Sequence, residues 1–368
     1  MRFDFVGELI FGSADSRSPS FKKGKTSNGS DYKLLNITVK AAENNRAYCS
    51  MFGMCRDVIT TTDVNGDSIE IDWEDRNDPD IIDTVSFGRK YVIAIDDDRH
   101  TFITEYDFIN YVAEHVDEFK GKRLNVRGSV RKELYKGKVT DRFNIQSIYA
   151  LNERQERQAN KLNVLGILWY TKDSFDFSEW KDERKIIINA YTEQYIDRDE
   201  GVKCLPHTVN MKCKYFESDD EDKANQTKLW MNTLMVDAKG DKINTLPKLK
   251  SKNVYSMSFR MLYNNGAEEE EFTEDSLTPL QKQFLKSGGY TLDDFRPKGT
   301  IYGNRKVTYN IVKFDITGKY EDGAVEEMTV NEFEDEKLYI FAEDEKIESV
   351  VERKADPVVE DDEDDLFS

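Results

Sequence analysis

The sequence predicts a mainly β protein with two successive β-barrel domains and a disordered acidic tail. Most segments alternate apolar and polar residues with a period of two, which is typical of half-buried strands. A strand, turn and strand at 120–152 have one apolar and one basic face, and the chain ends in a run of acidic residues. We therefore predict a first domain at 1–153, a linker at 154–161, a second domain at 162–345 and the tail at 346–368.

The composition predicts a soluble protein of a reducing compartment. Of the 368 residues, 38% are hydrophobic and 34% are charged, so two cores and a very polar surface are expected. No apolar run approaches the roughly 20 residues of a membrane span, and the start MRFDFVGELIFGS is too quickly polar for a signal peptide. Four cysteines are too few for a disulfide framework. We expect the cytoplasm, or the host cytoplasm if the protein is viral.

The segment 120–152 carries the strongest functional signal. Apolar Leu124, Val126 and Val130 alternate with Arg123, Arg127 and Arg131, and the turn signal Lys136-Gly137-Lys138 follows. Between positions 120 and 142 there are nine basic and two acidic residues, a local net charge of +7 in a chain of net charge −19. A basic strand face is typical of a groove for a polyanion. The alternative is an ordinary solvated sheet face.

The rest of the first domain predicts a barrel interrupted by an insertion. Gly7, inside a strand, marks a tight bend. The expected elements are strands at 3–11, 32–41 and 46–52, a long loop at 12–31, an insertion of short strands at about 60–104, and a helix at 105–119.

The long loop contains Gly24-Lys25-Thr26, which resembles part of a phosphate-binding loop. That motif requires a glycine five residues earlier, where Pro19 stands, and strands follow instead of a helix. We therefore predict a mobile basic loop carrying Lys22, Lys23 and Lys25.

Two further residue groups suggest metals only weakly. Asp63, Asn65, Asp67 and Glu74 have calcium-loop spacing, but the required turn glycine is missing and Asn65-Gly66 fits a hairpin turn. Cys204, His207 and Cys213 lack paired Cys-x-x-Cys spacing and an obvious fourth ligand. Cys213 also fits a strand alternation as a small buried residue. We predict no metal and no cofactor, and leave open whether these three residues bind zinc.

The region after the linker predicts a second, decorated barrel. LNVLGIL at 162–168 echoes LNVRGSV at 124–130, which suggests a duplication. A partly helical excursion is expected at 272–295. The expected strands lie at 185–195, 209–216, 229–238, 253–264, 308–320 and 337–341.

The order strand, long loop, strand, strand, helix, strand, strand resembles the OB-fold, a five-stranded barrel that binds single strands and oligosaccharides. The segments FVGELIFG, LLNITVK, RAYCSMFG and GKRLNVRGSVRKELYKGK…FNIQSIYAL resemble the strands of single-stranded DNA-binding proteins. This resemblance covers roughly residues 1–152. It implies an OB-fold in the first domain and an OB-like second barrel.

The tail resembles those of bacterial and phage single-stranded DNA-binding proteins. Six consecutive acids, 360–365, precede Leu366-Phe367, and Ser368 follows where many tails of that family end on Phe. The resemblance implies that the tail docks replication or recombination proteins and competes for the DNA groove. The partner-binding residues it implies are Asp361, Asp362, Glu363, Asp364, Asp365, Leu366 and Phe367.

The predicted function is therefore sequence-independent binding and protection of single-stranded DNA during replication, recombination and repair. Basic side chains would neutralise phosphates and aromatic rings would stack on bases. Tyr48 and Phe52 could instead be core residues, and Trp169, Tyr170, Trp180 and Trp230 could act as platforms in the second domain. The expected nucleic-acid-binding residues are Lys22, Lys23, Lys25, Lys33, Arg46, Tyr48, Phe52, Arg123, Arg127, Arg131, Tyr135, Lys136 and Lys138.

The sequence does not predict an enzyme. Only three histidines occur, and none has a nucleophile or metal pattern around it. One alternative function is a structural or assembly protein of a virion that uses OB-like barrels as interaction modules. Another is an accessory module that presents nucleic acid to an enzyme.

Overall fold

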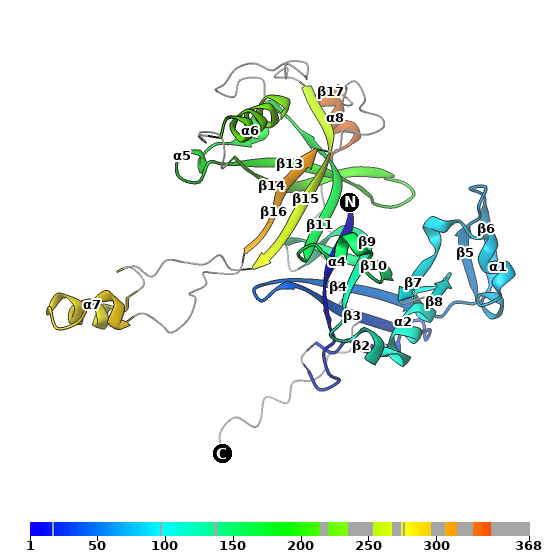
Figure 1. Cartoon of the computed structure of the whole chain (residues 1–368). Coiled ribbons are helices and arrows are strands. Elements are labelled where there is room, and N and C mark those ends of the chain that lie inside the picture. The colour runs from blue at the N-terminus through cyan, green and yellow to red at the C-terminus, as the bar shows by residue number, and fades with distance from the viewer. Residues whose placement is uncertain are drawn as a thin grey trace.

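The chain forms a mainly β molecule, which confirms the predicted fold class (Figure 1). No helix in the described part of the chain is long and apolar enough to cross a membrane. The computed structural model describes residues 1–16, 18–95, 98–135, 138–213, 220–234, 253–266, 274, 277–295, 306–314 and 327–339.

Five strands close the first barrel in the order expected for an OB-fold. They are β1 (Arg2–Ile10), β3 (Asp31–Ala42), β4 (Asn45–Met54), β9 (Arg123–Tyr135) and β10 (Lys138–Tyr149). Each pairs with the next in the circular order β1, β3, β4, β10, β9, and only the β4–β10 pair is parallel. The first, second, third, fifth and fourth strands thus form one closed ring, as the resemblance implied.

A helix follows the third strand, at the position expected from the sequence. It begins at Thr104, whose hydroxyl accepts a hydrogen bond from the Asp107 amide at 3.1 Å. The expected single helix is in fact two, α2 (Glu105–Glu114) and α3 (Val116–Phe119), because His115 leaves the helical conformation. Phe108, Ile109, Val112 and Phe119 are buried against the barrel.

The second barrel repeats the same pairing with strands β11 (Lys161–Tyr170), β13 (Lys185–Tyr195), β14 (Val202–Lys212), β15 (Asn253–Gly266) and β16 (Lys306–Phe314). Its circular order is β11, β13, β14, β16, β15, and again only the third and fifth strands pair in parallel. Helix α6 (Glu221–Leu234) lies between the third and fourth strands in the chain, as α2 and α3 do in the first barrel.

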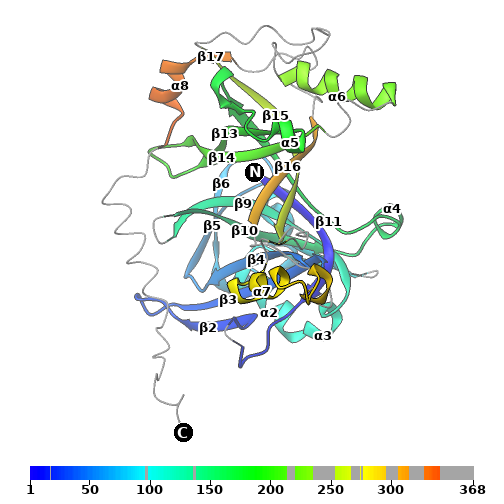
Figure 2. The ribbon, with the colours of Figure 1, turned by 90° about the vertical axis from the view of Figure 1, so that its left-hand side faces the viewer.

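The two barrels are stacked and joined through their first strands (Figure 2). β1 pairs with β11 from Arg2 to Val6 and with β3 from Glu8 to Ile10. Gly7 lies between these two pairings, and a Cβ there would stand 2.5 Å from the Lys40 carbonyl oxygen. The glycine therefore allows the close backbone approach at which β1 changes partner.

The hydrophobic core is continuous across the two barrels. The rings of Phe5 and Phe143 in the first barrel lie 6.0 and 4.9 Å from Tyr263 of β15, and Tyr263 lies 5.3 Å from Tyr309 of β16. This aromatic cluster and the β1–β11 pairing hold the barrels in a defined relative position.

The insertion forms a small lobe beside the first barrel (Figure 1). Ile59, Ile71, Val85 and Ile103 form its own core. β7 pairs in parallel with β10 and so extends the barrel sheet, whereas β5 and β6 form a separate hairpin. Its elements are β5 (Val58–Thr62), β6 (Ser68–Asp72), η1 (Trp73–Asp75), α1 (Pro79–Thr84), η2 (Phe87–Arg89), β7 (Tyr91–Ile95) and β8 (Asp98–Phe102).

The remaining short elements decorate the barrels. They are α4 (Glu153–Glu156) in the predicted linker, η3 (Lys172–Ser174), β12 (Phe175–Asp176), α5 (Trp180–Glu183), α7 (Pro279–Lys286) and η5 (Leu292–Phe295) within the expected helical excursion, and β17 (Glu327–Thr329) and α8 (Val330–Glu336).

Three sequence-based expectations about local structure are wrong. The expected strand at 229–238 begins inside helix α6, where Ala224, Thr227 and Met231 are buried at helical spacing. A short apolar run does not distinguish strand from helix. Here the buried residues follow helical spacing, so the segment folds as a helix.

The expected mobile loop at Lys22 to Lys25 belongs to β2 (Phe21–Lys25), which pairs with β3. Of the strand expected at 337–341, the described residues make one isolated bridge, between Leu338 and Cys204.

The sequence echo does not join equivalent strands. Residues 124–130 lie in β9, the fourth strand of the first barrel, whereas 162–168 lie in β11, the first strand of the second. The structural equivalent of β11 is β1, and the segments FDFVGEL at 3–9 and LNVLGIL at 162–168 share the glycine and the apolar phase. The two barrels do repeat one topology, but the matching segments are 3–9 and 162–168, and not 124–130 and 162–168.

Candidate nucleic-acid interface

The alternation of β4 turns two aromatic side chains outward. Ala47, Cys49 and Met51 point into the core, so Tyr48 and Phe52 lie on the outer face with 54% and 45% of their surface exposed. The Tyr32 ring of β3 lies 5.4 Å from the Phe52 ring. The sequence left open whether Tyr48 and Phe52 are core or surface residues. In the structure both are surface residues.

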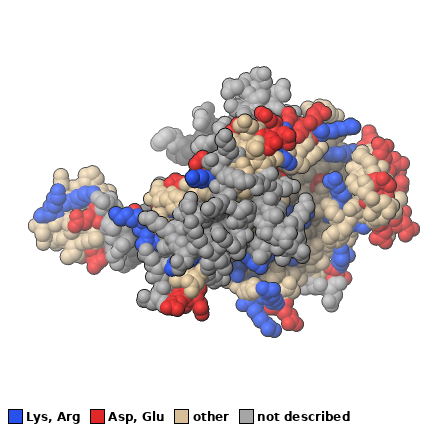
Figure 3. All heavy atoms as spheres, turned by 90° about the horizontal axis from the view of Figure 1, so that it is seen from above, with Lys and Arg blue, Asp and Glu red and all other residues tan. Residues whose placement is uncertain are grey.

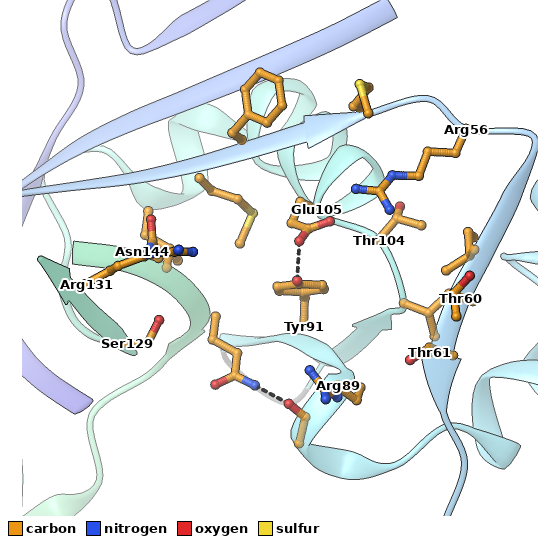
Figure 4. Close-up of a pocket in the computed structure, with 18 of the residues that line it drawn as sticks. Arg56, Thr60, Thr61, Arg89, Tyr91, Thr104, Glu105, Ser129, Arg131 and Asn144 are labelled. Carbon is orange, nitrogen blue, oxygen red and sulfur yellow. Dashed lines mark hydrogen bonds between the residues drawn. The ribbon is translucent and has the colours of Figure 1, made fainter. Parts of the chain in front are cut away.

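A hollow of about 720 Å³ lies between this outer face and the insertion, and we name it the first hollow (Figure 4). One wall is the outer face of β4, β9 and β10, including Phe52, Ser129 and Asn144. The facing wall comes from the insertion, including Thr60, Trp73 and Tyr91. The insertion therefore turns an open sheet face into a two-walled groove.

Both walls of the first hollow carry arginines. Arg131 and Arg142 come from the barrel, and Arg56 and Arg89 from the insertion side. In Figure 4 Arg131 lies on one side of the hollow and Arg56 and Arg89 on the other. Among the described residues, Arg56, Arg89 and Arg131 make no ion pair, so their charges face solvent or a ligand.

The two acidic residues of the first hollow are engaged by protein groups. The Tyr91 hydroxyl donates a hydrogen bond to the Glu105 carboxylate, and burial together with that carboxylate raises the pKa of Tyr91. Arg142 Nη1 lies 3.4 Å from Glu133 Oε1, and its Nε donates to Ser50 Oγ at 3.1 Å. With four arginines and two carboxylates, the site has a net positive charge.

The predicted site residues fall into three groups: those on the outer face of the first barrel, those that engage other parts of the protein, and those near the barrel's loops. Phe52 and Arg131 line the first hollow, and Arg127 lies farther along β9 on the same face. Tyr48 and Arg46 lie along β4, where Arg46 Nη2 is 3.3 Å from Glu43 Oε1.

Lys33 and Arg123 lie away from this face and engage the protein itself. Lys33 shares the inward phase of β3, where it donates to Asn110 of α2 and lies 4.6 Å from the Tyr106 ring centre. Arg123 donates to the carbonyls of Glu156 and Gln155 at 2.9 and 3.1 Å, at the C-terminal end of α4. These two predicted residues are therefore structural anchors and do not line the groove.

The basic residues near the first barrel's loops are only partly described. Lys22, Lys23 and Lys25 lie on β2, and Lys25 Nζ is 3.2 Å from Asp31 Oδ1. The backbones of Tyr135 and Lys138 end β9 and begin β10, without described side chains. Lys136 and the tail residues Asp361 to Phe367 lie outside the described residues.

Of the aromatic platforms considered for the second barrel, Trp169 and Tyr170 are buried and Trp180 is partly buried. Trp169 is fully buried beneath Phe333 of α8, with ring centres 5.7 Å apart, and Tyr170 is inside the core. Trp180 packs at the end of the second barrel, with the Arg184 guanidinium 5.5 Å from its ring, and the side chain of Trp230 is not described.

The three possible zinc ligands lie in separate surroundings. Cys204 packs with Trp169 and Phe333, Cys213 lies in the main core, and His207 lies 4.4 Å from the Tyr309 ring. Burial raises the pKa of the Cys204 and Cys213 thiols to about 12, which keeps them protonated. No group of three or more metal-ligating side chains occurs among the residues described.

Sequence reasoning missed the wall that the insertion contributes. Positions 57–84 hold ten acidic residues and one basic residue, and these acids cover the outer edge of the molecule at the far right of Figure 3. Arg56 directly precedes this run, and Arg89 and Lys90 follow it after four uncharged residues. The change from basic to acidic residues at one end of this run, and back to basic residues at the other, was the sequence signal that could have revealed the wall.

The fold and the hollow define a protein with two OB-fold barrels in tandem, one of which has a cationic groove on its outer face. No protein-family model and no curated protein sequence matches the chain. Solved structures with similarity to it include two of the single-stranded DNA-binding protein from Thermus aquaticus. The wild-type structure has 8% identity and a TM-score of 0.29, with 72% of this chain and 85% of that chain covered.

The second of these structures is a deletion mutant of the Thermus aquaticus protein. It has 12% identity and a TM-score of 0.28, with 76% of this chain and 96% of that chain covered. Because both TM-scores lie below 0.5, the fold assignment made here rests on the strand pairing of the chain itself.

Proposed function

We propose that this protein binds single-stranded DNA without reading its sequence, through the outer face of the first barrel. The observation that supports the proposal most is the first hollow, which combines arginines on two walls with the exposed ring of Phe52. Arginines neutralise phosphates and release counterions, and each stacked base contributes roughly 1–3 kcal/mol. One wall strand of the hollow, β4, is the third strand of the barrel and belongs to the strands 2 and 3 face on which OB-folds bind oligonucleotides.

The aromatic residues favour a single strand over a duplex. A ring can stack only on a base whose face is free, and the faces of paired bases are covered by their neighbours in the duplex. Tyr48 and Phe52 stand four residues apart on the outer phase of β4, with Ser50 between them. Four residues of strand span roughly 13 Å, so the two rings can stack on separate, non-adjacent unpaired bases of one nucleic-acid strand.

We further propose a role in coating strands during replication and recombination, with two domains at 1–153 and 162–345. In this proposal the acidic tail, including Asp361 to Phe367, recruits partner proteins and competes for the groove. The tail's run of acids is the feature that supports this, because a tethered polyanion resembles the ligand in charge.

Fluorescence anisotropy with a labelled oligothymidylate and a duplex competitor tests the proposal. We expect salt-sensitive binding that duplex DNA does not remove. The double variant Arg56→Glu/Arg131→Glu should bind at least 10-fold more weakly, because two charges that face the hollow are reversed. Lys172→Glu, an exposed change on the second barrel, is the matched control. Wild-type affinity in the folded double variant would show that the groove is misplaced, and no binding by the wild type would favour a structural role.

A further inference from the structure

A second hollow of about 480 Å³ lies where the two barrels meet the insertion. It is lined by β1, β9 and β10 of the first barrel, by η2 and β7, and by Leu165 of β11. Arg2, Asp4, Phe87, Lys90, Arg127 and Tyr149 supply its charged and aromatic groups.

The second hollow continues directly from the first. Gly88 and Gln146 line both of them, and Gln146 Nε2 donates a hydrogen bond of 2.9 Å to the Gly88 carbonyl. A β-bulge explains this contact: Ile145 and Ser147 pair with Gly128 and Arg127, which leaves Gln146 unpaired on β10. The bulge directs Gln146 toward η2, so one hydrogen-bonded contact separates two neighbouring hollows.

The second hollow has the same two chemical components as the first. The Arg127 guanidinium lies 5.0 Å from the Tyr149 ring centre and its Nε is 3.4 Å from Asp4, with 46% of the side chain still exposed. Arg2 and Lys90 bring the lining to three cations against one acid.

Phe87 is the aromatic group that needs an explanation. It is 65% exposed at the tip of η2, although burying a phenylalanine stabilises a fold by roughly 1.5–3 kcal/mol. The Arg99 guanidinium lies 5.9 Å from its ring. An exposed ring beside several cations is the arrangement that stacks a base and holds its phosphates.

We propose that the second hollow is a second binding subsite for single-stranded nucleic acid. A strand that leaves the first hollow crosses the Gly88–Gln146 contact, stacks a base on Phe87 and places phosphates against Arg127 and Arg2. This inference rests on the proposed function. It adds that the insertion extends the binding path from the first barrel to the junction with the second.

The test is a length series of oligothymidylates from about 4 to about 16 nucleotides, the range of site sizes of one OB-fold. Phe87→Ala should leave the Kd of the shortest bound oligonucleotide within about twofold of wild type. It should weaken the longest by about 5-fold to about 150-fold, which corresponds to one lost stacked base. Val64→Ala, at a position 66% exposed in the β5–β6 turn of the same insertion, is the matched control.

A second variant examines the phosphate contact. Arg127→Gln should reduce the dependence of log K on log salt by about one unit for the long oligonucleotide and leave it unchanged for the short one. Both variants are compared with wild type by thermal unfolding, so that a folding defect is recognised.

The possible failures are distinguishable. If Phe87→Ala and Arg127→Gln bind every length as wild type does, while Arg56→Glu/Arg131→Glu binds weakly, the second subsite is wrong and the proposed function stands. If Phe87→Ala weakens short and long oligonucleotides equally, the two hollows are not separate subsites. If the wild type binds no length at low salt, both proposals fail.

Discussion

At the scale of residues, a buried polar cluster joins the two barrels. Lys132 Nζ of β9 lies 3.1 Å from Asp141 Oδ1 of β10, and the Tyr309 hydroxyl of β16 donates to Asp141 Oδ2 at 2.7 Å. Burial alone would raise the pKa of Asp141, but Lys132 and the Tyr309 hydrogen bond outweigh it and lower that pKa. The Lys132 amide donates a hydrogen bond to Gln194 Oε1 of β13 at 2.6 Å.

His207, beside this cluster, makes the stability of the protein depend on pH. Burial, aided by the Lys132 charge, lowers its pKa to about 3, against 6.5 when exposed. Below pH 6.5 the unfolded state therefore binds more protons than the folded state, and stability falls as the pH falls toward 3. This histidine contributes a slope of up to about 1.4 kcal/mol per pH unit.

We expect His207→Phe to remove that contribution. Urea unfolding of the wild type and the variant at pH 7 and pH 5 measures it, because their difference in unfolding free energy should shift in favour of the variant at pH 5. Asp141 changes the stability of the protein mainly below pH 3.8, the pKa of an exposed aspartate, and this lies outside the range from pH 5 to pH 7. An equal loss of stability in both proteins between the two pH values would contradict the assignment.

At the scale of elements, the insertion functions as a wall only if it is held in place. Arg76 holds it: its guanidinium lies 4.2 Å from the Trp73 ring and its Nε donates to Asp107 of α2 at 2.9 Å. Both side chains of this ion pair are largely buried. The pair therefore ties the insertion to the helix that closes the first barrel.

Arg76→Ala should loosen the insertion and leave the barrel folded. We expect faster cleavage within residues 57–90 in limited proteolysis and an affinity for oligothymidylate several-fold lower, because the arginines of the two walls are no longer held in facing positions. Lys181→Ala, an exposed change on α5, is the control. Unchanged proteolysis and unchanged binding would show that the hydrophobic core of the insertion alone is sufficient.

At the scale of the whole molecule, two barrels of equal topology have unequal outer faces. β17 pairs with β15, and α8 covers Trp169 on the second barrel, whereas the corresponding face of the first barrel is open and bounded by the insertion. The first hollow and the second hollow beside it therefore both lie along the first barrel, the more basic of the two. The acidic residues behind the net charge of −19 lie elsewhere: residues 57–84 have a net charge of −9, the second domain at 162–345 one of −11, and the tail at 346–368 one of −6.

Deletion of residues 356–368 tests the proposed competition by the tail. The deletion removes seven acidic residues, and affinity for oligothymidylate should rise at low salt and approach that of the full chain at high salt, where such attraction is screened. A variant with these acids replaced by Ser and Thr separates charge from length. Equal affinities of all three proteins at every salt concentration would rule out the competition.

The local sequence pattern was sufficient to predict the position of a side chain where its surroundings depend only on its own strand. The period of two predicted that Arg127 and Arg131 share the basic face of their strand and that Tyr48 and Phe52 share one phase of theirs, but left open whether that second phase is core or surface; the structure has all four on the outer face. Two other predicted residues were misplaced: Arg123 is bound by the end of α4, which alternation within β9 does not reveal, and Lys33 lies on the inward phase of β3, where α2 covers it. The helix α2 and the end of α4, which bind these two, come from other parts of the chain.

The sequence by itself determined the fold class, the first barrel's order of strands and the charge of its β9–β10 hairpin. These depend on interactions between near neighbours in the chain, which period and turn residues reveal. The tertiary structure alone decided the two-walled groove, the bulge that directs Gln146 to Gly88 and the covering of Trp169 by α8. Each of these joins residues more than 50 positions apart, and such pairings depend on packing across the whole core, which no local pattern encodes.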